Sequence, residues 1–263
     1  MKTVVITGST RGIGLGLAEA FLANGCRVML SGRSQETVDR EVVRLAAKFG
    51  GERVAGQACD VTDDGQVEAL WQAAIRTYGS VDIWINNAGI GQILTPFWEL
   101  EPALMKIIVE TNLLGTMYGS RVALRGMLQQ GYGALYNMEG LGSRDGRIQP
   151  GLTLYGTTKA GMAYLDTALV KELEGKPVIV GSLSPGMVVT DMLLNQQTGS
   201  PEDWDRAKRA FNILADRVET VTPWLAEQIL ENQQHGKRIA WLTGLKVMGR
   251  FLTAPFTKRN VIE

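Results

Sequence analysis

The chain has 263 residues, of which 45% are hydrophobic and 21% charged, and its 27 Lys and Arg residues are balanced by 27 Asp and Glu residues. A formal net charge of zero argues against a nucleic-acid-binding protein, which usually carries a basic excess. The hydrophobic content is high enough to fill a sizeable core and excludes a largely disordered chain.

Strand-like runs alternate with helical patterns along the whole chain. The predicted strands are Thr3–Thr7, Arg27–Ser31, Arg53–Cys59, Asp82–Asn86, Ala134–Met138, Val178–Leu183 and Arg238–Leu242. The predicted helices are Gly12–Asn24, Gln35–Phe49, Asp64–Tyr78, Ala103–Gln130, Leu154–Glu174 and Pro223–Gln233. Several strands are continuously apolar, as strands buried on both faces are. This order predicts an α/β fold: a single Rossmann-like, doubly wound domain over residues 1–263, with a parallel sheet of about seven strands flanked by helices on both faces.

Two segments interrupt this alternation. An insertion at 190–217 follows the sixth predicted strand, where a doubly wound fold places its ligand cleft. A tail at 244–263 follows the last strand. We expect both to cover a substrate, although ordinary surface packing explains them equally well. The apolar side chains expected to line a wide pocket there are Met192, Leu193, Leu194, Trp204, Phe211, Phe251 and Phe256.

A glycine-rich turn lies between the first strand and the first helix. It reads Thr7-Gly8-Ser9-Thr10-Arg11-Gly12-Ile13-Gly14. Glycines in this position permit a tight turn and let the backbone approach a pyrophosphate at the positive end of the helix. The turn therefore predicts dinucleotide binding by residues Gly8 to Gly14.

The end of the second strand indicates which dinucleotide binds. Folds that bind NAD usually place an Asp or Glu here to hold the ribose 2′-hydroxyl, but this chain has Arg33. A guanidinium matches the 2′-phosphate of NADP, and Arg11 adds a second positive charge. We expect NADP(H) as the cofactor; the alternative is that Arg33 is simply solvated.

Tyr155 and Lys159 are four residues apart at the start of a predicted helix, so they lie on one helical face. An ammonium near a phenol favours the phenolate, and we expect the tyrosine pKa to be lowered towards neutrality, as suits acid–base catalysis. The same spacing often occurs between unrelated solvent-facing neighbours.

Taken together, these motifs resemble the short-chain dehydrogenase/reductase family over essentially the whole chain. The matching pieces are TGSTRGIG, Asp60-Val61, Asn86-Asn87-Ala88-Gly89, Asn112, Tyr155-x-x-x-Lys159 and Pro185-Gly186-Met187-Val188-Val189-Thr190. The resemblance implies that Tyr155 is the general acid, that Lys159 binds the ribose and tunes Tyr155, and that Asn112 holds a relay water. It also implies further cofactor contacts at Asp60, Val61, Asn87, Ala88, Gly89, Pro185, Gly186, Val188 and Thr190.

One element departs from the family pattern. Most relatives have a catalytic serine thirteen residues before the tyrosine, where this chain has Gly142. The sequence Asn137-Met138-Glu139-Gly140-Leu141-Gly142-Ser143 resembles the chlorophyll b reductase branch, whose members use NADPH to reduce a formyl group. We expect Ser143 to act as the oxyanion donor. The alternatives are that Glu139 acts instead, as a protonated donor or as a group that hydrogen-bonds the substrate, or that neither residue does. The predicted substrate residues are thus Glu139, Met192 and Leu193.

The predicted function is thus an NADPH-dependent carbonyl reductase acting on an aldehyde or ketone, with a bulky formyl compound as one candidate. The alternatives are a 3-oxoacyl or other small-carbonyl reductase and a non-catalytic NADP(H) sensor. Two cysteines and one histidine leave little material for a metal site, and none is expected. The strand at the very start predicts no signal peptide, and no apolar run approaches a membrane span of ~18 residues. We expect a cytoplasmic homodimer or homotetramer that binds no nucleic acid, with peripheral contact to an anionic membrane through its basic tail.

Overall fold

The computed structural model describes residues 1–144, 146, 148–194, 201–254, 256–257 and 259–262, with the side chains of 201–207 left out. The described residues form a seven-stranded, all-parallel sheet in the order β3-β2-β1-β4-β5-β6-β9. These strands are β1 Thr3–Ile6, β2 Arg27–Gly32, β3 Val54–Ala58, β4 Ile83–Asn86, β5 Ala134–Met138, β6 Ile179–Ser184 and β9 Arg238–Ala240. The strand order changes direction between β1 and β4, which is where such sheets bind ligands.

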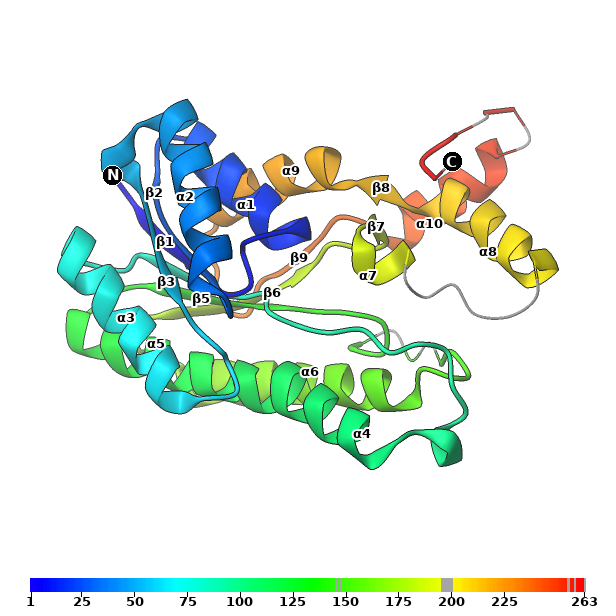
Figure 1. Cartoon of the computed structure of the whole chain (residues 1–263), viewed down its shortest axis with the longest axis horizontal. Helices are drawn as coiled ribbons and strands as arrows, with labels where there is room; N and C mark the ends of the chain where they lie inside the picture. Colours follow the sequence, from blue (N-terminus) through cyan, green and yellow to red (C-terminus); the bar gives the residue numbers. More distant parts are fainter. Residues whose placement is uncertain (145, 147, 195–200, 255, 258, 263) are drawn as a thin grey trace.

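Helices cover both faces of the sheet (Figure 1). The face carrying Val4, Ile6 and Leu30 packs against α1 Gly12–Ala23, α2 Gln35–Phe49 and α9 Val218–Glu231. The face carrying Val5, Met29 and Trp84 packs against α3 Asp64–Tyr78, α5 Gly115–Gln130 and α6 Thr153–Glu172. Apolar side chains alternate between these two cores along each strand, so both faces are buried and the strands read as continuous apolar runs. The predicted α/β fold with about seven strands is confirmed.

The predicted helix at 103–130 differs from the structure. It is divided into α4 Pro102–Val109, a π-helical segment Glu110–Leu114 and α5. The π-helical segment is labelled η3. Two short 3-10 turns are also described: η1 Gly51–Arg53, between α2 and β3, and η2 Phe97–Glu99, between β4 and α4. Single π turns interrupt α-helices most often at functional sites, and this one contains Asn112.

The insertion and the tail lie at one end of the molecule (Figure 1). They contain α7 Asp191–Leu194, α8 Pro201–Leu214, β8 Asp216–Arg217 and α10 Gly244–Thr253, and β7 Val188–Val189 directly precedes the insertion. Strands β7 and β8 pair as a separate two-stranded parallel sheet. No helix among the described residues is long and apolar enough to cross a membrane.

Candidate active site

The glycine turn connects β1 to α1 at the carboxyl edge of the sheet. Gly8 has φ +63°, and a Cβ there would lie 2.9 Å from the Cα of Ala88. A Cβ at Gly14 would lie 2.3 Å from the carbonyl oxygen of Gly8. Helix α1 begins at Gly12, and the preceding residue, Arg11, makes no side-chain capping hydrogen bond. The N–H groups of the first helical turn are therefore suited to an anionic ligand such as a pyrophosphate.

The segment after β4 is locked onto this turn. The backbone N–H groups of Asn87 and Ala88 both donate to the Thr7 hydroxyl at 3.0 Å. The Asn87 side chain donates to the carbonyls of Thr7 and Gly8 at 2.9 and 3.0 Å. Ser9 is buried, and its hydroxyl donates to the Ile6 carbonyl at 2.8 Å. The Ser9 backbone N–H donates to the Ser31 carbonyl at 2.8 Å, so both the side chain and the N–H of Ser9 stabilise the turn.

The residues that flank the glycine turn lie close to one another, as expected for a dinucleotide-binding site. A Cβ at Gly32, the last residue of β2, would lie 2.9 Å from the Thr10 side chain, so this turn and the residue before Arg33 are adjacent. Arg33 is exposed and makes no ion pair within the described part of the chain. The Arg11 guanidinium lies 3.4 Å from the Asp191 carboxylate of α7, and both groups are largely exposed.

The other predicted cofactor residues lie at the same edge of the sheet. Thr190 approaches the turn, because its Cγ2 would lie 3.5 Å from a Cβ at Gly12. Asp60 accepts hydrogen bonds from the backbone and hydroxyl of Thr62 at 3.0 and 2.8 Å, and Val61 packs against α5. The rest follow the ends of β1, β4 and β6 and are Ile13, Gly89, Pro185, Gly186 and Val188. This arrangement fits an NAD(P)-type dinucleotide laid across the switch point.

Tyr155 and Lys159 lie in the first two turns of α6, where Lys159 is buried and Tyr155 is half-buried. The Lys159 ammonium lies 5.9 Å from the centroid of the Tyr155 ring and donates to the Met138 carbonyl at 2.9 Å. The Tyr155 backbone N–H donates to the Gln92 side chain at 3.0 Å. Gln92, which the sequence analysis missed, also donates to the Gly151 carbonyl at 2.6 Å and so fixes the start of α6.

The expected lowering of the tyrosine pKa is not found. Burial raises the pKa of Tyr155 to about 12. Burial also lowers the pKa of Lys159 to about 8, against the opposing effect of the Asp166 and Glu139 carboxylates. Desolvation is thus the largest cause of the pKa shift for each group. Tyr155 is therefore a protonated phenol at neutral pH, which is the form that a general acid requires.

Asn112 is fully buried in the π-helical segment. Its Oδ1 accepts from the Ile90 N–H at 2.8 Å, and its Nδ2 donates to the Ile90 carbonyl at 2.9 Å. The side chain thus fixes the segment after β4 next to the start of α6, where its Nδ2 also reaches the Thr158 hydroxyl at 3.5 Å. The water-holding role that the family implies for Asn112 stays a prediction.

The segment after β5 places Gly140 next to both Tyr155 and Ser143. Gly140 lies against the tyrosine, since a Cβ at Gly140 would lie 2.4 Å from the Tyr155 hydroxyl. A side chain at position 140 would displace Tyr155, so a serine at that position would not fit. The Ser143 hydroxyl accepts instead from the Gly140 N–H at 3.0 Å. The turn therefore holds the Ser143 hydroxyl against the Gly140 backbone.

Glu139, the alternative to Ser143, is buried and paired with two arginines. Its side chain is 1% exposed, and its carboxylate contacts the guanidinium groups of Arg144 and Arg238 at 2.9 and 2.8 Å. Both of its oxygens therefore accept from protein donors. These contacts leave no free oxygen facing a substrate, and the interpretation of Glu139 as a protonated donor stays a prediction.

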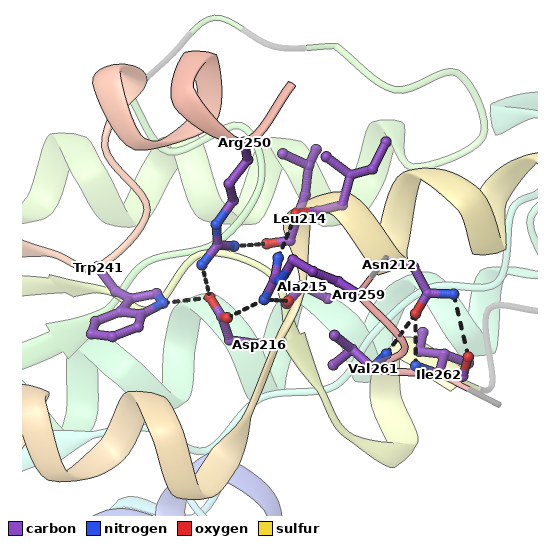
Figure 2. A network of polar contacts seen from close by, with 10 residues as sticks. Asn212, Leu214, Ala215, Asp216, Trp241, Arg250, Arg259, Val261 and Ile262 are labelled. Carbon is purple, nitrogen blue, oxygen red and sulfur yellow. Dashed lines mark hydrogen bonds and ion pairs between the residues drawn. The ribbon is translucent and has the colours of Figure 1, made fainter. Parts of the chain in front are cut away.

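The insertion and tail are joined by a polar cluster around Asp216 (Figure 2). The buried Asp216 carboxylate accepts hydrogen bonds of 2.6 Å from Trp241, Arg250 and Arg259. Although burial opposes it, the hydrogen bonds from Trp241 and Arg250 hold the pKa of Asp216 below its ordinary value. The two arginines also donate to the last carbonyls of α8, so α8, α10 and the tail form one unit.

The predicted substrate-covering residues are only partly described. Met192 and Leu193 lie on α7, shortly after the predicted cofactor residue Thr190, and Met192 is exposed. Phe251 and Phe256 are exposed at the molecular surface rather than enclosed in a cavity. The side chain of Trp204 lies outside the described residues. The wide apolar pocket stays a prediction.

Comparisons with known proteins agree with this geometry. Residues 2–200 match the family model described as short chain dehydrogenase. The chain is 38% identical to chlorophyll(ide) b reductase NOL of Arabidopsis thaliana, over 92% of this chain and 70% of that protein. It is 35% identical to the probable chlorophyll(ide) b reductase NYC1 of Arabidopsis thaliana, over 96% of this chain. The chain spans about half (53%) of the NYC1 protein.

Solved structures share the fold. A 3-ketoacyl-(acyl-carrier-protein) reductase from Brucella melitensis, complexed with NADH, superposes with a TM-score of 0.80 at 23% identity, over 93% of this chain and 98% of that one. The protein ElxO with NADP bound gives a TM-score of 0.79 at 24% identity, over 94% of this chain and 99% of that one. With the glycine turn, the parallel sheet and the Tyr155–Lys159 pair in place, the family match is unambiguous, and the chain belongs to the short-chain dehydrogenase family.

Proposed function

We propose that this chain is an NADPH-dependent carbonyl reductase. The observation that carries the proposal is the convergence of three features at one sheet edge: the glycine turn, the Tyr155–Lys159 pair and the Ser143 turn packed against the Tyr155 hydroxyl. A scaffold that only bound a dinucleotide would have no physical need for the second and third features. This disfavours the alternative of a non-catalytic sensor.

Each residue has a distinct part in the proposed reaction. When bound, NADPH supplies a hydride to the carbonyl carbon. Tyr155 donates the proton that the carbonyl oxygen gains, because burial keeps the phenol protonated at neutral pH. The Ser143 hydroxyl donates a hydrogen bond to the same oxygen and stabilises the negative charge that develops there. Lys159 is held in place by the Met138 carbonyl and orients the ribose beside Tyr155.

The preference for NADPH rests on Arg33. Its exposed guanidinium follows β2, and its neighbours in the sequence, Gly32 and Ser34, are not acidic. We expect kcat/KM with NADPH to exceed that with NADH by at least about tenfold, which is about 1.4 kcal/mol. Arg33→Ala should remove most of this preference, whereas Arg40→Ala, which removes an arginine already paired with Glu41, should leave it unchanged. Equal use of both cofactors by the unaltered chain would refute the assignment.

The proposed substrate is a bulky aldehyde. The support is the similarity to proteins named chlorophyll(ide) b reductases, together with an apolar α7 next to the cofactor edge. The alternative is a small-carbonyl reductase of the 3-oxoacyl kind. NADPH oxidation should be measured against a panel containing a formyl-bearing tetrapyrrole and short 3-oxoacyl thioesters. Turnover of the thioesters alone would favour the alternative.

We also propose that the outer face of α10 contacts an anionic membrane from the cytoplasmic side. Leu245, Met248, Phe251, Leu252 and Phe256 are between 51% and 90% exposed. No Asp or Glu occurs between positions 237 and 262, so these apolar side chains lie in a segment without acidic residues. Exposed apolar side chains without nearby negative charge favour contact with an anionic lipid surface. Sedimentation with phosphatidylglycerol vesicles, but not with phosphatidylcholine vesicles, is expected. Leu252→Asp should abolish it without affecting NADPH binding, and absence of sedimentation would contradict the proposal.

Self-association as a homodimer or homotetramer is also proposed. Exposed apolar residues along α4 and α5 support it, among them Leu104, Ile107, Met117 and Leu128. Sedimentation velocity at micromolar concentration should show a species of at least twice the 28.7 kDa chain mass. A monomer at that concentration would contradict this proposal.

A further inference from the structure

A buried carboxylate next to the proposed catalytic residues has no part in the reaction described above. Glu139 follows β5, and both of its oxygens accept from protein donors. Oε1 accepts from the Arg144 guanidinium at 2.9 Å and from the Ser182 hydroxyl at 2.8 Å. Oε2 accepts from the Arg238 guanidinium at 2.8 Å. The carboxylate therefore joins strands β6 and β9 to the segment that follows β5.

The position of Arg144 in the sequence explains what this ion pair does. Residues 140–143 form a turn that is closed by two hydrogen bonds: the Gly140 N–H donates to the Ser143 hydroxyl at 3.0 Å, and the Ser143 N–H donates to the Gly140 carbonyl at 3.2 Å. Glu139 immediately precedes this turn and Arg144 immediately follows it. Their ion pair therefore connects the two ends of the turn that carries Ser143.

Arg238 anchors this turn to the sheet. Its guanidinium binds Glu139 and also donates to the Ser184 hydroxyl at 3.0 Å. On its other side the turn adjoins the proposed general acid, because a Cβ at Gly140 would meet the Tyr155 hydroxyl. Ion pairs of this kind add little net stability, since desolvation offsets the attraction, but they can fix one arrangement among several. Here the arrangement fixed is that of Ser143 relative to Tyr155.

We propose that Glu139 is a positioning residue for Ser143, acting through its ion pairs with Arg144 and Arg238. This inference rests on the proposed function, in which Ser143 is the oxyanion donor. Glu139→Gln keeps the size of the side chain and one acceptor oxygen but removes the charge. At pH 6, well below the Lys159 pKa of about 8 that Glu139 helps to maintain, we expect kcat to fall about tenfold while the Kd of NADPH stays within twofold. The reason is that no residue of the glycine turn contacts this cluster.

A double-mutant cycle tests whether Glu139 acts through Ser143. Ser143→Ala alone should lower kcat by about 10²-fold, as loss of an oxyanion donor typically does. Adding Glu139→Gln to Ser143→Ala should lower kcat by less than twofold further, because no hydroxyl remains to be positioned. A full tenfold further loss would show that Glu139 acts independently of Ser143 and would overturn the proposal.

A matched control separates positioning from a general loss of stability. Glu41 on α2 is also buried and paired with two arginines, Arg40 and Arg44. Helix α2 connects β2 to β3, whereas the Ser143 turn follows β5, so Glu41 is remote from the turn. Glu41→Gln should lower the melting temperature about as much as Glu139→Gln does and should leave kcat unchanged. An equal fall in kcat for both variants would contradict the proposal.

A second readout does not depend on turnover. Amide hydrogen exchange of residues 139–144 should be at least fivefold faster in Glu139→Gln than in the unaltered chain, and unchanged in Glu41→Gln. Unchanged exchange in Glu139→Gln would overturn the positioning role whatever the substrate is. Faster exchange in a chain that reduces no carbonyl would instead leave the turn assignment standing and refute only the proposed function.

Discussion

The pKa of Asp166 is the residue property that the sequence indicates least. It lies on α6, is 1% exposed, and accepts a hydrogen bond from Asn137 at Oδ1. Its Oδ2 has no partner among the described residues. Burial raises the pKa of Asp166 to about 7, and the Glu139 carboxylate adds to this while Asn137 and Arg144 oppose it.

This shift predicts how stability depends on pH. Between about pH 4 and pH 7 the folded chain keeps a proton that the unfolded chain has lost, so the contribution of Asp166 to the free energy of unfolding falls as pH rises. Asp166→Asn does not titrate. The free energy of unfolding of Asp166→Asn minus that of the unaltered chain should therefore increase by at least about 1 kcal/mol between pH 5 and pH 8. Urea denaturation at the two pH values measures this.

The exposed Asp39 on α2 is the control for this measurement, because its carboxylate lies at the surface. Asp39→Asn should show no change between the two pH values. A difference between Asp166→Asn and the unaltered chain that stays constant with pH would mean that Asp166 is ionised throughout.

Lys159 also predicts a pH dependence, this time of the reaction. Because burial lowers its pKa to about 8, the ammonium is present below that pH and is lost above it. If the charged form orients the ribose and stabilises the tyrosine site, kcat for carbonyl reduction should be constant up to about pH 7.5 and should fall above pH 8. Stopped-flow single-turnover rates from pH 6 to pH 10 test this, and a rate that rises through pH 8 would contradict it.

At the residue level, the sequence identifies groups that are close along the chain and misses those that are not. Tyr155 and Lys159 are recognisable because one helical turn separates them. The partners of Glu139 are not recognisable, because Arg238 lies 99 residues away and only the pairing of β6 with β9 brings it near. Without these cations, an acidic residue beside Ser143 could be interpreted as a protonated donor.

At the level of secondary-structure elements, the sequence predicts helix ends correctly where capping residues mark them. Helix α3 begins and ends where the sequence predicts, because Asp63 caps its first turn and Gly79 takes the left-handed conformation at its end. The break between α4 and α5 was missed, since the helical pattern of apolar residues continues through the π turn. Strands β7 and β8 are two residues each and pair across 28 positions, so neither leaves a pattern in the sequence.

The unit formed by α8, α10 and the tail depends on one carboxylate. Asp216→Asn would leave Lys246, Arg250 and Arg259 close together without a counter-charge, since the Asp216 carboxylate acts on all three cations. We expect trypsin to cleave this region at least tenfold faster, and KM for a bulky aldehyde to rise about fivefold. NADPH affinity should not change, because the glycine turn is not involved.

Asp64→Asn provides the matched control, because it breaks an exposed ion pair with Arg121 on the opposite face of the sheet. It should alter neither trypsin cleavage nor KM. If Asp216→Asn resists trypsin as well as the unaltered chain does, then α10 and the tail are held by apolar packing rather than by the Asp216 cluster.

At the level of the whole molecule, the fold could be predicted because the alternation of buried strands and amphipathic helices dictates it. Parallel strands joined by right-handed crossovers allow few arrangements, and the glycine turn after the first strand fixes the switch point. The substrate region could not be predicted to the same depth. Its shape depends on contacts between segments 190–217 and 244–263, which meet only in the folded chain.

The most direct test of the proposed reaction is the effect of Tyr155→Phe on NADPH oxidation with a formyl-bearing tetrapyrrole. The variant removes only the hydroxyl that donates the proton. We predict that kcat falls by about 10³-fold, within the range for loss of a general acid, while the Kd of NADPH measured by fluorescence stays within threefold. A kcat close to that of the unaltered chain would show that Tyr155 does not donate the proton and would contradict the account.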